Sequence, residues 1–190
     1  MSTKYKFKNK DGCYFISFST VGWIDVFTRR SYKDALVENL KYCQREKGLE
    51  LFAWCIMTNH VHLIARAKEG TLLADIIRDF KKYTSRKIVE TIRTEPESRR
   101  EWLLKHFETA AIIHSKTKNH KVWQDGNHAI ELYNERFTWT KVQYIHQNPV
   151  RAGLVTSAEF WKYSSASNYQ EMISVFPEIY RLTPPLTIVK

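Results

Sequence analysis

The hydrophobic and polar positions along the chain alternate between short apolar runs and longer segments with helical spacing. The short runs are rich in β-branched and aromatic residues, which is typical of strands. They cover residues 13–21, 51–57, 61–67 and 126–132. Longer segments place apolar residues three or four positions apart, which predicts helices over residues 31–47, 72–93, 97–113 and 135–147.

Particular residues predict where these helices begin, end and face the core. Ser31 is a candidate N-cap for the first helix, and Gly48 is expected to end it. Pro149 is expected to stop the last helix at Gln147, because proline donates no backbone hydrogen bond. Two apolar stripes are predicted, one of Leu73, Ile76, Ile77, Phe80, Thr84 and Ile88, and one of Trp102, Leu103, Phe107 and Ala110.

The order of elements is strand, helix, hairpin, helix, then strand and helix. Antiparallel strands with helices on one face form an α+β sandwich, and this order predicts a ferredoxin-like antiparallel sheet with helices packed on it. Residues 97–113 would be a helical insertion, and the residues after the last helix a C-terminal tail. No linker or repeat divides residues 1–190, so a single domain is expected.

The charge balance favours a polyanionic partner. The chain has 30 Lys and Arg against 20 Asp and Glu, a formal net charge of +10. No apolar run approaches the roughly 20 residues of a membrane span, so nucleic acid is the expected partner and a membrane is not. The three cysteines (Cys13, Cys43 and Cys55) include no CxxC pair and are expected to be buried thiols in a reducing cytoplasm.

The second strand of the predicted hairpin begins with two histidines, His60 and His62. Alternate residues of a strand point to the same face, so both imidazoles would project together and could chelate a divalent ion. Ordinary polar strand residues show the same spacing, and spacing alone leaves both interpretations open.

The last helix offers a nucleophile and a further ligand. Tyr144 and Asn148 are four residues apart and therefore share one helix face. A phenol can attack phosphorus, and an amide oxygen can bind a metal. A core or interface tyrosine is the alternative for Tyr144.

Basic residues supply candidate phosphate contacts. They gather on the helix after the hairpin, and one more follows the tyrosine helix. A solvated charged face is the alternative to a DNA-contacting one. The candidates are Arg78, Lys81, Lys82, Arg86, Lys87 and Arg151.

Two stretches carry a family resemblance. IMTNHVHLI (56–64) resembles the HUH motif, two histidines flanking a hydrophobic residue. YIHQNPVRAGLV (144–155) resembles the tyrosine segment of single-tyrosine HUH transposases, in particular the REP-associated tyrosine transposases. FKKYTSRKI (80–88) and VWQDGNHAIEL (122–132) also resemble that branch, so the similarity spans about residues 14–170. Thr58 replaces a proline common in the family, and Asn148 stands where the insertion-sequence branch has glutamine.

The resemblance implies a tyrosine transposase that cleaves and rejoins single-stranded DNA through a 5′-phosphotyrosine intermediate, at hairpins of the REP kind. It implies Tyr144 as the nucleophile, and His60, His62 and Asn148 as ligands of Mg²⁺ or Mn²⁺. Family members work as monomers or as homodimers that exchange the tyrosine helix, and the sequence does not choose between them. The expected location is the cytoplasm, associated with the nucleoid through DNA. Two alternatives are a hairpin-binding module that no longer cuts, and a metal hydrolase of another class.

Overall fold

The computed structural model describes residues 7–113 and 119–185. Its centre is an antiparallel four-stranded sheet with the strand order β2-β3-β1-β4. This order, with one helical crossover between β1 and β2 and another between β3 and β4, is that of a ferredoxin-like fold, so the predicted fold class is confirmed. The strands are β1 (Tyr14–Ser19), β2 (Leu49–Ile56), β3 (His60–Ala67) and β4 (His128–Glu131).

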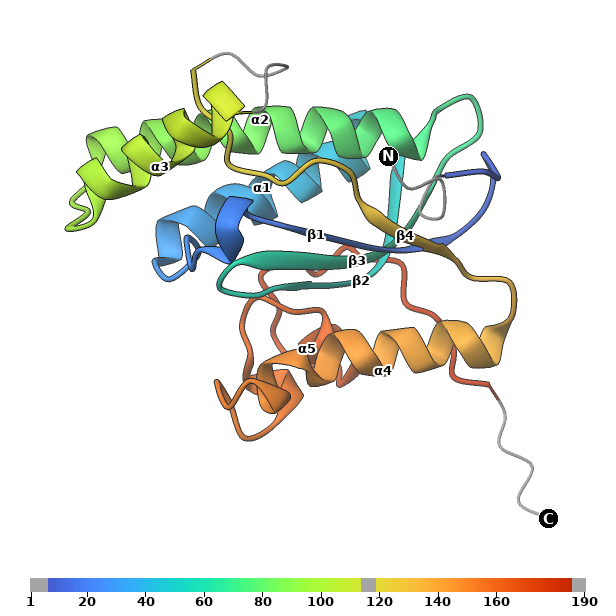
Figure 1. The fold of residues 1–190 in the computed structure, drawn as a ribbon. Helices are drawn as coiled ribbons and strands as arrows, with labels where there is room; N and C mark the ends of the chain where they lie inside the picture. The colour runs from blue at the N-terminus through green and yellow to red at the C-terminus, as the bar shows by residue number, and fades with distance from the viewer. Residues whose placement is uncertain (1–6, 114–118, 186–190) are drawn as a thin grey trace.

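Helices cover both faces of the sheet (Figure 1). On one face lie α1 (Arg30–Glu46) and α2 (Leu73–Thr94), with α3 (Arg100–Ile113) packed against α2. On the other face lie α4 (Glu135–Arg151) and the short α5 (Ala166–Tyr169). The prediction that the helices share one face is therefore wrong.

The reason lies in β2, which is buried on both sides. Trp54 and Ile56 belong to the core beneath α1 and α2. The alternate residues Ala53 and Cys55 belong to a second core that α4 closes. A strand that is apolar on both faces must be covered twice, and its continuous hydrophobic run hides the alternation that would reveal this.

The apolar stripe of α2 is confirmed, since all six of its predicted residues are buried. In α3, Leu103 and Phe107 are buried as expected, but Trp102 is 54% exposed. Trp102 instead stacks on His106 one turn further along the helix, with 6.0 Å between the ring centres. An aromatic residue at helical spacing therefore need not face the core.

Two predicted helix starts are wrong. Ser31 lies inside α1, whose N-cap is Arg29 without a side-chain capping bond. Tertiary contacts hold this end instead: Arg29 pairs with Glu97 at 3.0 Å, and the Lys33 ammonium donates to the Phe27 carbonyl at 2.7 Å. Likewise, α3 begins at Arg100 rather than at residue 97.

Pro149 does not stop α4, which continues to Arg151. A proline this close to the end of a helix removes only one intrahelical donor, and its ring is buried here. The last turn is closed by hydrogen bonds from the Ala152 amide to the Asn148 carbonyl (3.0 Å) and from the Leu154 amide to the Pro149 carbonyl (2.9 Å). Arg151 therefore lies on the same helix as the candidate nucleophile.

The chain after α4 returns to the sheet and covers the outer edge of β2. The Ile56 amide donates to the Tyr163 carbonyl, the Ser165 amide to the Trp54 carbonyl, and the Tyr180 amide to the Leu51 carbonyl, each at 2.9 Å. The C-terminal tail thus satisfies backbone groups that an edge strand would otherwise leave open.

The cysteines are free thiols. Cys43 and Cys55 are buried as expected, whereas Cys13 is half-buried. Burial raises the pKa of Cys43 to about 12, so its thiolate is strongly disfavoured. Among the helices of the described residues, none is both long and apolar enough to cross a membrane.

Candidate functional site

The two histidines of β3 point to the same side of the sheet. His60 pairs with Ser19 of β1, and His62 pairs with Ser17, so both lie in regular strand positions. Their ring centres are 4.7 Å apart, with an angle of 78° between the ring planes. The expected convergence of the two imidazoles is confirmed.

His62 is a buried polar group without a partner. It is 4% exposed, and neither ring nitrogen has a hydrogen-bond partner among the described residues. Burial, followed by the nearby His60, lowers the pKa of His62 to about 3. Asn148 opposes this shift from close by, although it forms no hydrogen bond with either ring nitrogen. The ring is therefore neutral at neutral pH, which is the form that binds metals.

His60 is held in one orientation by its neighbour. Its Nδ1 lies 2.6 Å from Oδ1 of Asn59, which accepts a hydrogen bond when Nδ1 carries the proton. Asn59 is itself fixed, because its Nδ2 donates to the Trp23 carbonyl at 3.0 Å. This arrangement leaves Nε2 of His60 available as a ligand, since an outer hydrogen bond selects the tautomer. Burial lowers the pKa of His60, opposed by Asp25.

Tyr144 is brought to the histidines by α4. The N-cap of the helix is Asn134, whose Oδ1 accepts from the Phe137 amide at 2.8 Å, and the helix packs on β2 and β3. The Tyr144 ring centre lies 5.5 Å from that of His62. The two motifs therefore meet within one chain, without a second copy.

Asn148 follows one turn later on the same face. Its Nδ2 donates to the Tyr144 carbonyl at 2.8 Å, which leaves Oδ1 as the atom able to bind a metal. It lines the same cleft as His60, His62 and Tyr144.

This donor set is compatible with a divalent ion. Among residues 7–113 and 119–185, no group of three or more His, Cys, Asp or Glu is placed to hold a metal. The donors predicted from the sequence are two imidazoles and one amide oxygen, from His60, His62 and Asn148. Such a set suits an ion that keeps oxygen ligands from water or phosphate, as Mg²⁺ and Mn²⁺ do. The unpartnered nitrogens of His62 are the observation that favours an ion here.

The site opens into a cleft of about 1080 Å³. Phe15 lines it and stacks on His62, with ring centres 5.5 Å apart. Trp23 and the loop 124–127 also line it. Lys81 fixes this loop by donating to the Gln124 and Gly126 carbonyls, both at 2.8 Å.

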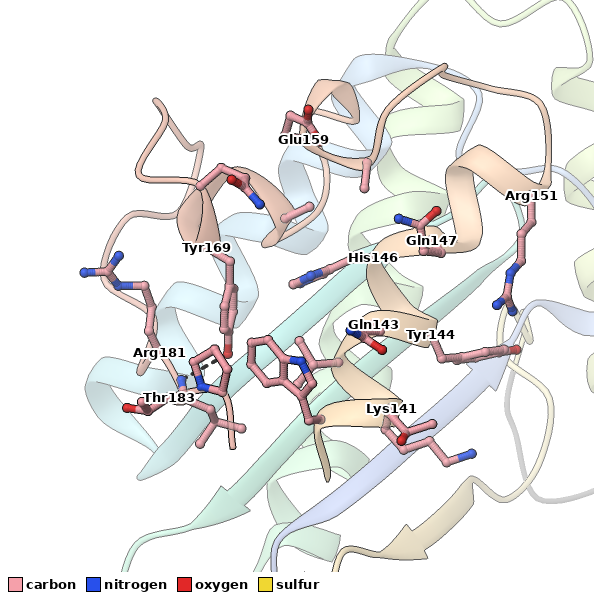
Figure 2. A pocket seen from close by; sticks show the side chains of 18 residues that line it. Lys141, Gln143, Tyr144, His146, Gln147, Arg151, Glu159, Tyr169, Arg181 and Thr183 are labelled. Atoms are coloured by element: carbon pink, nitrogen blue, oxygen red, sulfur yellow. Dashed lines mark hydrogen bonds between the residues drawn. The ribbon is translucent and has the colours of Figure 1, made fainter. Parts of the chain in front are cut away.

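A second cleft, of about 1200 Å³, lies between α4 and the C-terminal tail (Figure 2). Its lining includes His146, Tyr169 and Arg181. Tyr144 and Lys141 line both clefts, so the candidate nucleophile lies where the two meet.

Two cations approach the Tyr144 ring (Figure 2). The Arg151 guanidinium lies 5.5 Å from the ring centre, and the Lys141 ammonium lies 5.6 Å from it. Arg151 was predicted as a phosphate contact and lies beside the candidate nucleophile Tyr144. Lys141 was missed, although its position one turn before Tyr144 on the same helix could have indicated it.

The basic residues of α2 are placed differently. This helix lies across the sheet from Tyr144, so its cations do not line the histidine cleft. Arg78 pairs with Asp75 and Asp79, and Lys87 pairs with Glu90 at 3.1 Å. Lys81 is engaged by the loop 124–127. Lys82 and Arg86 line a groove between α1 and α2. A DNA-binding role for these five residues stays a prediction.

Asn59 and Trp23 were not recognised from the sequence as parts of the site. Their roles depend on loop conformation, and a lone Asn in a turn or a lone Trp near a strand carries no specific pattern. Asn59 does precede His60 directly, which was the one available signal.

Part of the chain matches a known protein family. Residues 23–109 match the family described as IS200-like transposases. The predicted resemblance to transposases is confirmed over this part of the chain. The matched part contains His60 and His62 and ends before Tyr144. No curated protein matches the chain.

A solved transposase structure shares the fold. A REP-associated tyrosine transposase bound to a REP hairpin aligns over 100% of both chains, with a TM-score of 0.61 and 18% identity. A putative transposase from Deinococcus radiodurans R1 aligns over 76% of this chain and 95% of its own, with a TM-score of 0.43 and 18% identity. At 18% identity, the first comparison concerns the fold alone.

Proposed function

We propose that this transposase-like chain cleaves and rejoins single-stranded DNA, with Tyr144 as the nucleophile and a divalent metal at His60, His62 and Asn148. One observation carries the proposal: Tyr144 meets a buried, unpartnered His62 within one chain, with ring centres 5.5 Å apart. A tyrosine used only for packing would not need to lie beside His62. A histidine that only filled the core would have a hydrogen-bond partner.

The chemistry follows from this arrangement. The Tyr144 oxygen attacks a phosphorus of the DNA backbone, an O–P bond forms, and the bond from phosphorus to the 3′ oxygen breaks. The phenol proton passes to solvent, and the leaving oxygen takes one up as a 3′-OH. A 5′-phosphotyrosine remains and conserves the bond energy, so a later 3′-OH can reverse the step without ATP.

The residues around Tyr144 have separate roles in this reaction. Lys141 and Arg151 place positive charge where the phosphate must sit and so favour its binding. Asn59 keeps His60 oriented, and Phe15 excludes water beneath His62. When bound, the divalent ion would supply Lewis-acid polarisation of the phosphate.

Single-stranded DNA, in a hairpin context, is the proposed substrate. The net charge of +10 favours a nucleic acid, and the aromatic residues of the histidine cleft can contact unstacked bases. The structurally similar transposase was solved with a REP hairpin, which supports a hairpin for this chain. Such a reaction would take place in the cytoplasm, at the nucleoid.

The test uses hairpin DNA with single-stranded flanks, labelled at one end or the other, and Mn²⁺. With a 3′ label, a denaturation-resistant protein–DNA adduct is expected. With a 5′ label, a shortened free strand ending in 3′-OH is expected, because the 5′ phosphate stays on the protein. Chelator should abolish both products.

Tyr144→Phe is expected to lose the adduct, with Tyr133→Phe, an exposed tyrosine just before α4, as the matched control. An adduct that persists in Tyr144→Phe would overturn the choice of nucleophile. Tight hairpin binding without any adduct would favour the alternative, a DNA-hairpin-binding module without cleavage.

A further inference from the structure

Trp23 combines a large exposed ring with an unusual backbone conformation. Its side chain is 60% exposed, and its φ is +55°. Asn119 and Glu171 are the other non-glycine residues with positive φ in the described parts of the chain. Asn tolerates this region best, and a bulky aromatic residue there is an outlier. Strain of this kind persists where the surroundings impose it, and it gathers at functional sites.

The residues around Trp23 impose its positive φ. Trp23 ends the 3₁₀ turn η2 (Val21–Trp23), in which Gly22 also has a positive φ of +66°. A Cβ on Gly22 would come within 3.1 Å of the His106 ring, so the turn is pressed against α3. The Trp23 amide donates to the Thr20 carbonyl at 3.2 Å, and its carbonyl accepts from Nδ2 of Asn59 at 3.0 Å.

This fixed turn presents the indole at the candidate metal site. The ring centre of Trp23 lies 5.9 Å from that of His60. Asn59 contacts both residues, since it binds the Trp23 carbonyl through its nitrogen and His60 through its oxygen. Trp23 and Tyr144 line the same cleft. Core packing does not account for a ring that is mostly exposed.

We infer that Trp23 is a positioning residue that stacks on a base of the single-stranded DNA next to the scissile phosphate. This inference rests on the proposed function. A base held on the indole would place its own phosphate over the His60–His62 pair, opposite Tyr144. Stacking on one aromatic ring tolerates all four bases, so Trp23 sets the position of the strand and not its sequence.

The test measures binding of a fluorescein-labelled oligothymidylate by anisotropy, in full-length protein carrying Tyr144→Phe so that cleavage plays no part. Trp23→Gly should weaken binding at least fivefold, equivalent to about 1 kcal/mol for one stacked base. Its Tm should stay equal or rise, because glycine adopts a positive φ without strain. Trp23→Phe should recover most of the affinity. Phe160→Ala, on an exposed aromatic ring outside both clefts, is the control and should change nothing.

The outcomes separate the inference from the proposed function. Unchanged affinity in Trp23→Gly overturns the inference, as does a lower Tm with an affinity that Trp23→Phe does not restore. An equal loss in Phe160→Ala also overturns it. If the protein with Tyr144 intact forms no adduct but Trp23→Gly still weakens binding, the proposed cleavage fails and the stacking role stands.

Discussion

At the scale of single residues, His62 shows how a site can oppose stability. Its two ring nitrogens are buried without hydrogen-bond partners among the described residues. An unsatisfied buried polar group costs about 1–3 kcal/mol, which a bound metal would recover. The spacing of His60 and His62 was enough to predict that their imidazoles share a face, whereas the family resemblance was needed to predict that Tyr144 meets them. The sequence could not show that His62 is unpartnered, because that depends on what Phe15 and α4 place around it.

Replacing His62 with phenylalanine should therefore raise the free energy of unfolding, measured in EDTA, by about 1 kcal/mol. The apolar ring removes the unsatisfied nitrogens and keeps the stack on Phe15. The same variant should form no adduct with DNA and Mn²⁺. A destabilised variant would show that the nitrogens of His62 have partners in solution.

Two buried histidines also predict acid sensitivity. The pKa of His62 is lowered to about 3, and burial lowers that of His146 to about 4, both from an ordinary value of 6.5. The folded chain then binds fewer protons than the unfolded one, so stability is full above pH 6.5 and falls as the pH drops towards 4. Each group contributes a slope of up to about 1.4 kcal/mol per pH unit.

Urea unfolding of the metal-free protein between about pH 7 and pH 4 measures this slope. His146→Gln can keep the contact with Ser165, whose hydroxyl lies 2.8 Å from the imidazole, and should flatten the curve. An unchanged slope in His146→Gln would contradict the assignment of His146.

At the scale of elements, buried polar contacts fix a helix boundary that the local sequence pattern did not predict. The apolar stripe of α2 was predictable because a helix buries one face. The start of α1 was not, because it depends on Glu97, which lies 68 residues away from its partner Arg29. The Glu97 carboxylate is 1% exposed and pairs with Arg29 and Arg99. Burial opposes its ionisation, but hydrogen bonds from Arg99, Tyr32 and Arg29 lower its pKa to about 2.

Glu97→Gln should destabilise the protein by about 2–3 kcal/mol, because it leaves two arginines without their carboxylate. The stabilisation from Glu97 is present above the ordinary carboxyl pKa and is lost as the pH falls towards 2. Denaturation at neutral pH measures the effect, with the exposed Glu46→Gln as the control. Equal stabilities of the two variants would show that this ion-pair cluster contributes nothing.

Lys81 gives a second prediction at this scale. Its ammonium holds the loop 124–127, and burial lowers its pKa to about 8. Lys81→Met should speed amide hydrogen exchange in that loop, whereas Lys82→Met, one residue away and exposed, should not. Equal exchange in both variants would favour the original prediction of Lys81 as a phosphate contact.

At the scale of the whole molecule, the β2 edge and the candidate site are each completed within one chain. The tail occupies the β2 edge, and Tyr144 reaches His62 of its own chain. The order of elements predicted the sheet but not that the C-terminal tail covers the β2 edge, because a tail rich in turns carries no strand pattern. Nor did it predict helices on both faces, since β2 is apolar on each side.

A mixing experiment tests this independence. Equal amounts of the His62→Phe and Tyr144→Phe proteins should form no adduct with hairpin DNA and Mn²⁺, because neither chain has a complete site. Exchange of α4 between two chains would restore one complete site per pair. Recovered adduct would therefore show that the tyrosine acts on a partner's histidines.

The position of Tyr144 between two clefts bears on how strands could be exchanged. A nucleophile at the end of a closed pocket admits a single strand, and the strand that leaves must return by the same route. A tyrosine reached from two sides could release its first 3′ end into one cleft and receive another 3′ end through the other. The same phosphotyrosine could then join DNA segments that were not neighbours before cleavage.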